Sequence, residues 1–211
     1  EAGLSSASQL GGKSWGITQS GSSFHFMGAK IAKKEGLLLK YKPLQKVGAI
    51  IGALKSGQID AWSIVPHIAK GLAKGGAVKI IGNVADYLPN YQVTSVFTSA
   101  ANAAYERAKT EAFIAAFTKG AADFNAALVD KTAGDAAAED MVKLIHKYVY
   151  NTRPYEKAAP SIRNGAMRIN SGAALNTTSI KEQLDWFKAE KLVKSSINMD
   201  TLVDSSYVKT L

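Results

Sequence analysis

The sequence predicts an α/β protein with a mostly parallel sheet in its first part and helices in its last part. Between residues 13 and 83, short apolar runs alternate with helical segments, which is typical of βαβ units. After Ala100, apolar residues recur at helical spacing among many alanines, which favours helix. A chain of 211 residues that is 46% hydrophobic is also large enough to bury a core.

Period-two apolar runs and their flanking turns place the strands. Strands are predicted at residues 14–18, 39–44, 59–65, 78–81 and 91–98. The first of them leads through a Ser-rich turn into the first helix.

Helix start and stop signals place the helices. Helices are predicted at residues 23–35, 47–55, 66–74, 105–128, 135–150 and about 179–191. Gly36 follows the first helix as a stop, and Pro66 suits the first position of the third. The last helix is predicted to begin with Thr178 or Ser179 as N-cap and Glu182 as the capping-box partner. Residues 153–160 are predicted to be a linker because they carry two prolines.

The charge of the chain does not indicate a nucleic-acid partner. The chain has 26 Lys and Arg residues against 17 Asp and Glu residues, a net charge of +9. The basic residues occur singly or in pairs beside acidic ones and form no Arg-rich run. We therefore expect a solvated basic surface that mildly attracts anions, and no nucleic-acid binding.

Composition also restricts the chemistry and the compartment. The chain has no cysteine, which excludes disulfides, thiolate catalysis and Cys-type zinc sites. Every apolar run is interrupted well before the roughly 18 residues that a bilayer span requires. The sequence opens at Glu1 without a basic and apolar leader, so we expect that a signal peptide, if there was one, has been removed.

The most informative segment joins the first predicted strand to the first predicted helix, with the sequence GITQSGSSFH at residues 16–25. A helix N-terminus offers unpaired N–H groups and a partial positive charge, and serine hydroxyls there bind an anion or cap the helix. Ser20, Ser22 and Ser23 are therefore candidate ligand-binding residues, and an ordinary N-cap role for Ser20 or Ser22 is the alternative. With Gly21 as its one turn glycine, the segment is neither a P-loop nor a dinucleotide fingerprint.

Two further side chains are candidates with a structural alternative. His25 lies in the first helical turn, where it either faces a ligand or packs against the protein. Trp62 follows Asp60 by two residues and shares its face of a predicted strand. An aromatic at the carboxyl end of a parallel strand either contacts a ligand or packs in the core.

The sequence gives no sign of catalysis, metal or cofactor. His67 and His146 lack a His or acidic partner four residues on, so no metal site is predicted. No nucleophile elbow of the Gly-x-Ser-x-Gly kind occurs, and no pair of carboxylates has a spacing that singles out a general acid and base. An enzyme is therefore the less favoured interpretation, and no cofactor is expected.

Three ordered segments carry a family resemblance: LGGKSWGI at residues 10–17, SGSSFH at 20–25 and LKSGQIDA at 54–61. They resemble landmarks in the second lobe of the binding proteins of bacterial ABC importers for sulfonates, taurine, nitrate and thiamine-pyrimidine precursors. That family has the type II periplasmic binding fold. Residues 91–98 are similar to its returning hinge strand, and residues 202–207 to its closing segment.

The resemblance implies a division into two lobes. Residues 10–90 would form the second lobe, which carries the ligand-binding helix N-terminus. Residues 91–211 would form the hinge strand and the C-terminal helical part of the first lobe. Because a single copy of the Gly-Gln-x-Asp-Ala segment is present, the N-terminal half of that first lobe is expected to be missing.

The resemblance also implies a function. A small anionic or polar solute would be captured between the lobes outside the cytoplasm, in the periplasm, and delivered to the membrane permease of an ABC importer. The full-length protein would be a monomer. Carried over to this chain, the ligand-binding residues are Ser20, Gly21, Ser22, Ser23, His25, Trp62, Tyr91 and Thr94.

Two alternatives belong to other functional classes. Relatives on the same fold take part in the synthesis of a pyrimidine precursor, but the His-rich and Cys-rich active segment of such an enzyme has no counterpart in a chain without cysteine. Effector-binding domains of transcription regulators share the fold too. They would be cytoplasmic and accompany a helix-turn-helix, which these residues do not contain.

Overall fold

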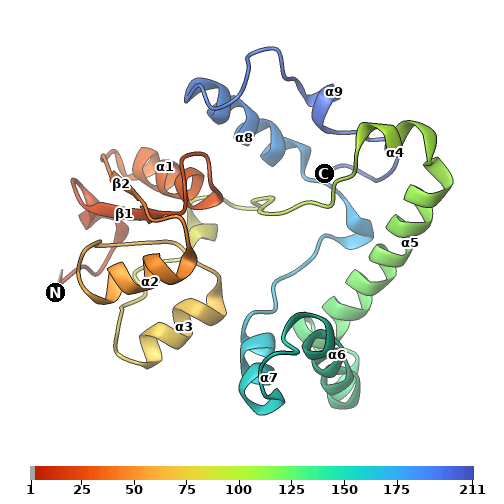
Figure 1. Cartoon of the computed structure of the whole chain (residues 1–211), viewed down its shortest axis with the longest axis horizontal. Coiled ribbons are helices and arrows are strands. Elements are labelled where there is room, and N and C mark those ends of the chain that lie inside the picture. Colours follow the sequence, from red (N-terminus) through yellow and green to blue (C-terminus); the bar gives the residue numbers. More distant parts are fainter. Residues whose placement is uncertain (1–2) are drawn as a thin grey trace. The chain divides into compact units, whose positions relative to one another are not determined.

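The computed structural model describes residues 3–211 and divides the chain into two compact units (Figure 1). The first unit comprises Glu1–Val93 and Ser179–Asn198, and the second comprises Thr94–Thr178 and Met199–Leu211. The α/β fold class is confirmed.

The first unit is built around a small parallel sheet. Strand β1, Ser14–Ile17, pairs with β2, Lys40–Pro43, and Ser14 lies opposite Lys40. Helix α1 connects the two strands, as the sequence predicts. The helices of this unit are η1 (Ala7–Leu10), α1 (Ser23–Glu35), α2 (Val47–Lys55), α3 (Pro66–Lys74), η2 (Val84–Asp86) and most of α8 (Thr177–Ala189).

Different helices cover the two faces of β1. Trp15 faces α1, where its indole Nε1–H donates to the backbone oxygen of Phe24 at 3.0 Å. Gly28 allows this approach, since an added Cβ would lie 2.7 Å from Trp15 Nε1. Gly16 points to the opposite face by strand alternation, and a Cβ there would lie 2.8 Å from Ile50 Cγ2 of α2. Helices α1 and α2 therefore pack on opposite faces of the sheet.

The strand predicted at residues 59–65 is wrong, because this segment makes a single parallel bridge, between Trp15 and Ala61. The Gly16 N–H donates to the oxygen of Ala61 at 2.9 Å, which continues the sheet for one residue. The chain then turns into α3, which begins at Pro66. Proline has no N–H to donate to a neighbouring strand, so it ends strand pairing, and it suits the first position of a helix.

The strands predicted at residues 78–81 and 91–98 are also wrong. Both segments are irregular in the described chain. Their apolar alternation fits a strand, but a strand also needs a neighbour that receives its backbone hydrogen bonds.

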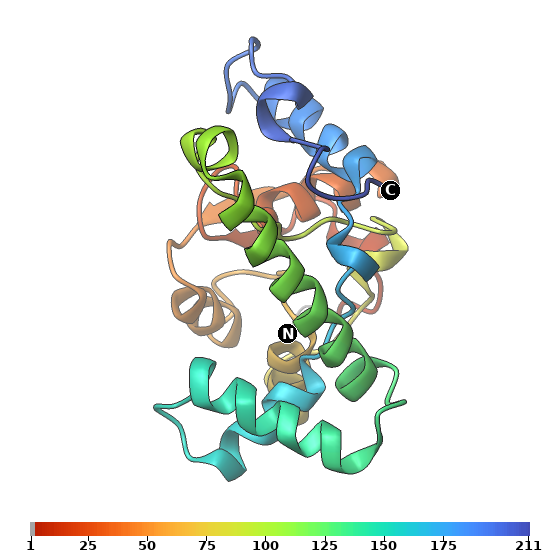
Figure 2. The ribbon, with the colours of Figure 1, turned by 90° about the vertical axis from the view of Figure 1, so that its right-hand side faces the viewer.

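The second unit is helical, and Figure 2 shows its long helix α5 with α6 and α7 at the carboxyl end. The predicted helix at 105–128 starts earlier, at Ala100, and breaks at Glu106, whose φ and ψ of −118° and 41° are not helical. The elements are α4 (Ala100–Tyr105), α5 (Arg107–Phe124), the π-helix η3 (Asn125–Val129), α6 (Gly134–Val149), α7 (Tyr155–Asn164), η4 (Ser171–Ala173) and α9 (Met199–Leu202). No helix within residues 3–211 is both long and apolar enough to cross a membrane.

The linker predicted at residues 153–160 is wrong, because α7 runs through Pro160. Ala158 is fully buried and Ile162 is nearly so, and both belong to one core cluster with Val142 of α6. This packing outweighs the backbone hydrogen bond that Pro160 cannot donate.

Helix α8 also begins earlier than predicted, at Thr177. Glu182 does not form the predicted capping box; its carboxylate pairs with Lys30 of α1 at 2.6 Å. The ring of Trp186 meets that of Phe26 edge to face at 5.3 Å. Most of α8 thus belongs to the first unit, whereas the family resemblance implies that residues 91–211 as a whole belong to the other lobe. Which lobe each unit represents stays a prediction.

Candidate functional site

A short turn at residues 18–22 leads from β1 into α1. Gly21 has a φ of 79°, a left-handed conformation that glycine adopts without a steric cost. Its N–H donates to Nδ1 of His25 at 3.1 Å. Ser22 is the N-cap: its backbone oxygen accepts the His25 N–H at 2.9 Å, and its Oγ accepts it more weakly at 3.4 Å. The turn is thereby fastened to the first turn of the helix.

The amino end of α1 presents unused hydrogen-bond donors. In the described chain, the N–H groups of Ser23 and Phe24 have no acceptor, and the hydroxyls of Ser20 and Ser23 have no partner. The first turn of α1 contains no acidic residue, while Lys33 and Lys34 lie in its last turn. The positive end of the helix dipole is therefore not compensated from within the helix. Chemically, this turn suits an anion or a polar acceptor.

Trp62 lies against the same helical turn, because its ring meets Phe24 edge to face with the centroids 5.4 Å apart. The indole Nε1 of Trp62 is buried and has no hydrogen-bond partner in the described chain. The hydroxyl of Ser63, a residue that is 5% exposed, is in the same state. Buried polar groups are nearly always hydrogen-bonded. The ring also packs against the core cluster of Ile50, Ala53 and Ile59. The unpaired indole N–H makes Trp62 a candidate donor, and its role as a ligand contact stays a prediction.

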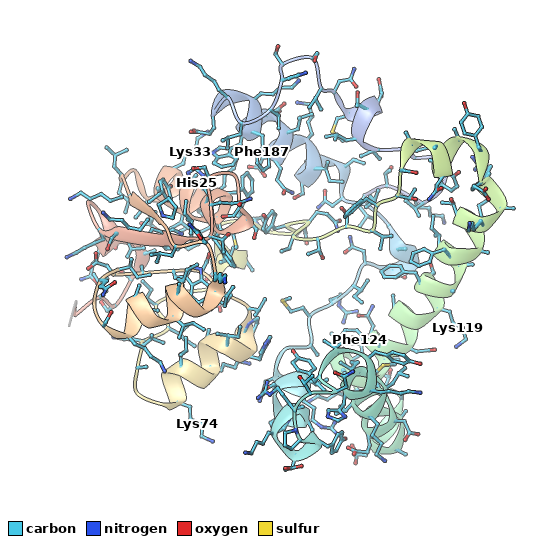
Figure 3. The ribbon with its side chains drawn as sticks, in the orientation of Figure 1. His25, Lys33, Lys74, Lys119, Phe124 and Phe187 are labelled. Carbon is cyan, nitrogen blue, oxygen red and sulfur yellow. The ribbon has the colours of Figure 1, made fainter. Side chains whose placement is uncertain are left out.

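His25 is packed rather than open. Its ring meets Tyr41 of β2 at 4.3 Å and Trp186 of α8 at 5.0 Å, both edge to face. Figure 3 shows it on α1 close to α8, which carries Phe187. Burial lowers the pKa of His25 below its usual 6.5, and the charge of Glu190 opposes this shift. These contacts favour the packing alternative for the ring.

The two remaining candidates lie apart from the turn in sequence. The ring of Tyr91 stacks on Phe26 of α1, with centroids 5.4 Å apart and an interplanar angle of 29°. Burial raises the pKa of Tyr91 to about 12, so its hydroxyl is neutral. Thr94 is exposed and belongs to the second unit. Both stay predictions as ligand contacts.

Helix α8 supports the turn, which the sequence pattern does not predict. A Cβ added to Gly21 would lie 3.3 Å from Cε1 of Phe187 and 3.5 Å from Cδ1 of Leu192. Trp186 and Phe187 of α8 are adjacent in the sequence, but nothing local indicates what they contact.

Asp60 is a structural residue and not a ligand group. The N–H and hydroxyl of Ser14 both donate to its Oδ2, at 2.8 and 2.6 Å. These bonds hold its pKa below the usual 3.8. Within residues 3–211, no three His, Asp or Glu side chains are grouped so that they could hold a metal ion.

The small parallel sheet of the first unit, with helices on both faces, fits the class of periplasmic binding protein folds. A similar solved structure is the alkanesulfonate-binding protein SsuA from Xanthomonas axonopodis pv. citri bound to MOPS. The likeness has a TM-score of 0.62 and 19% sequence identity, over 92% of this chain and 63% of that chain. This chain therefore spans less than two thirds of that protein. At such an identity the likeness shows the fold.

The family model described as NMT1/THI5 like matches residues 1–127, and the chain belongs to this family. No curated protein matches the chain. The resemblance to binding proteins of the sulfonate and nitrate type is confirmed. Family and fold together point to a binding protein rather than an enzyme.

Proposed function

We propose that this chain forms part of a solute-binding protein that captures a small anionic or polar molecule outside the cytoplasm. The solute is held at the amino end of α1 and then delivered to the membrane permease of an ABC importer. Binding changes no covalent bond and uses no cofactor. We expect the full-length protein to be a monomer.

The observation that carries this proposal is the set of unpaired donors at one helix end. The N–H groups of Ser23 and Phe24 and the hydroxyls of Ser20 and Ser23 surround one end of the helix dipole. Trp62, whose ring contacts that of Phe24, carries a further buried N–H without an acceptor. Donors without acceptors favour a ligand that brings several acceptor atoms, such as a sulfonate, nitrate or carboxylate. The net charge of +9 attracts such anions over a longer range.

Thermal unfolding with a panel of solutes tests the proposal. MOPS, which is bound to the similar solved structure, ethanesulfonate, nitrate, acetate and a neutral pyrimidine are the probes. A ligand that binds only the native state at 100 times its dissociation constant adds about 2.7 kcal/mol of stability. We expect at least one anion to raise the unfolding temperature in a concentration-dependent way, and the neutral pyrimidine to raise it less.

Paired serine variants locate the site. Ser20→Ala with Ser23→Ala removes two hydroxyls and spares the N-cap Ser22, so we expect weaker binding with little change in stability without ligand. The control is Ser195→Ala with Ser196→Ala, two exposed residues of the same unit. If no anion shifts the unfolding temperature, the binding function is wrong. If the Ser20→Ala, Ser23→Ala variant binds the anion as tightly as the Ser195→Ala, Ser196→Ala control, the site assignment is wrong.

A further inference from the structure

The imidazole of His25 connects both sides of the proposed binding turn. Its backbone N–H is bonded to Ser22, and its side-chain Nδ1 accepts the N–H of Gly21 at 3.1 Å. The same residue thus fixes the N-cap through its backbone and the preceding glycine through its ring. Ser20 directly precedes Gly21, and Ser23 directly follows Ser22, so both serines flank the two residues that His25 holds.

The hydrogen bond to Gly21 determines the state of the ring. An Nδ1 that accepts an N–H carries no proton, so the neutral ring has its proton on Nε2. A protonated ring has N–H groups at both positions. Its Nδ1–H would face the N–H of Gly21, donor against donor, and this bond would be lost.

The ring of His25 is partly buried against two other elements of the first unit. Tyr41 of β2 and Trp186 of α8 meet it edge to face. The charged or titratable groups that act on it from these elements are Glu190, just after α8, and Tyr41. Burial raises the pKa of Tyr41 to about 12, so this group stays neutral. Glu190 favours the imidazolium, and burial, the larger effect, disfavours it.

We propose that His25 is a positioning residue for the solute-binding turn and that its protonation releases the turn and weakens solute binding. This inference rests on the proposed function. It assigns His25 an indirect role: the ring shapes the turn and the serine donors meet the solute. Because the neutral form is the one that holds Gly21, affinity is highest at neutral pH. It falls once the pH drops below the usual 6.5 of histidine towards the lowered pKa of this ring.

A ligand-free measurement tests the first half of this inference. The amide signal of Gly21 in ¹⁵N-resolved NMR should move with the titration of the His25 ring between about pH 8 and about pH 5. In His25→Asn, whose side-chain oxygen is placed to accept the Gly21 N–H and does not titrate, this movement should be absent. If the Gly21 amide signal does not shift as His25 titrates, the positioning role of His25 is wrong. This outcome does not depend on whether the protein binds a solute.

Binding of ethanesulfonate, whose charge is constant over this range, tests the second half. Loss of the Gly21 hydrogen bond weakens binding of the unaltered protein at the acid end, and the attraction between the imidazolium and the anion offsets part of this loss. The net prediction is roughly a 3-fold weaker affinity. His25→Asn should keep the neutral-pH affinity and lose the pH dependence, and His25→Leu should bind weakly at every pH. The matched control is His146→Asn in the second unit, where His146 Nε2 lies 2.7 Å from the oxygen of Arg153. This variant should keep the pH dependence.

The outcomes separate the two proposals. A pH dependence that persists in His25→Asn would refute the role of His25 and leave the binding function intact. If no anion of the panel binds at any pH, the binding function fails, and the Gly21 signal alone decides whether His25 positions the turn.

Discussion

Ser14 and Asp60 are joined by reciprocal hydrogen bonds that involve the backbone and the side chain of each residue. The Ser14 hydroxyl donates to Asp60 Oδ2 at 2.6 Å, and the Asp60 N–H donates back to Ser14 Oγ at 2.9 Å. The Asp60 N–H also lies 3.1 Å from the backbone oxygen of Ser14. The acidic residue of the Gly-Gln-x-Asp-Ala segment therefore secures the end of that segment to the first residue of β1. This places Trp62, two residues later, beside the first turn of α1.

Removing the Ser14 hydroxyl should destabilise the first unit. Ser14→Ala loses a hydrogen bond to a half-buried carboxylate and leaves the Asp60 N–H with one acceptor fewer, so we expect a loss of about 1–2 kcal/mol. Urea denaturation measures it. Ser195→Ala, at an exposed position, should stay within about 0.5 kcal/mol of the unaltered protein. Equal stabilities for the two variants would contradict the role of this pair.

The same pair predicts an acid-dependent contribution to stability. The Ser14 hydrogen bonds lower the pKa of Asp60 in the folded state below the usual 3.8. Between the two pKa values the unfolded chain binds more protons, so this contribution is complete above the usual pKa and is lost as the pH falls through the folded one. The difference in unfolding free energy between the unaltered protein and Asp60→Asn should shrink over that range. In Ser14→Ala, whose folded pKa lies nearer the usual value, the loss should be smaller and complete at a higher pH. A difference that does not change with pH would argue against a shifted Asp60.

Glycines in two helices should respond oppositely to alanine. In Gly28→Ala the new methyl would lie 2.7 Å from Trp15 Nε1 and 3.0 Å from Tyr41 Cε1, and overpacking of this kind costs about 1–3 kcal/mol. In Gly52→Ala nothing lies within 4 Å of the methyl, and a better helix former should add roughly 0.5–1 kcal/mol. Thermal and urea unfolding of both variants check the signs. A stabilised Gly28→Ala would mean that α1 does not approach the sheet so closely.

Local signals account for the part of the fold that the sequence predicts well. Helix α1 runs from Ser23 to Glu35, as predicted, because its N-cap Ser22 and its terminating Gly36, with a φ of 65°, act on the nearest residues. Helix α3 likewise begins at Pro66. The strands predicted at 59–65 and 91–98 are wrong, because a strand depends on a distant partner that apolar alternation does not reveal.

Local sequence also predicts some features of the candidate site, while others depend on tertiary packing. The Ser22 cap and the free N–H groups at the start of α1 follow from sequence, since every helix end has them. The Gly21 to His25 bond depends on a side-chain rotamer, and the contacts from Trp186 and Phe187 depend on where α8 docks. Neither of these is encoded in the spacing of residues 16–25.

Gly21→Ala should damage the turn through its backbone more than through crowding. A non-glycine residue at a φ of 79° costs about 1–2 kcal/mol wherever its side chain points. The new methyl would also lie 3.3 Å from Cε1 of Phe187, a contact that a small ring movement relieves. The double variant with Phe187→Ala separates the two effects. If backbone strain dominates, Gly21→Ala destabilises the protein almost as much in the Phe187→Ala background as alone, and anion binding is weakened in both. If the loss disappears in that background, the contact with α8 is what requires glycine. Urea denaturation and ethanesulfonate titration of the four proteins in this cycle give the answer, because the turn that Gly21 shapes is the one that presents Ser20 and Ser23.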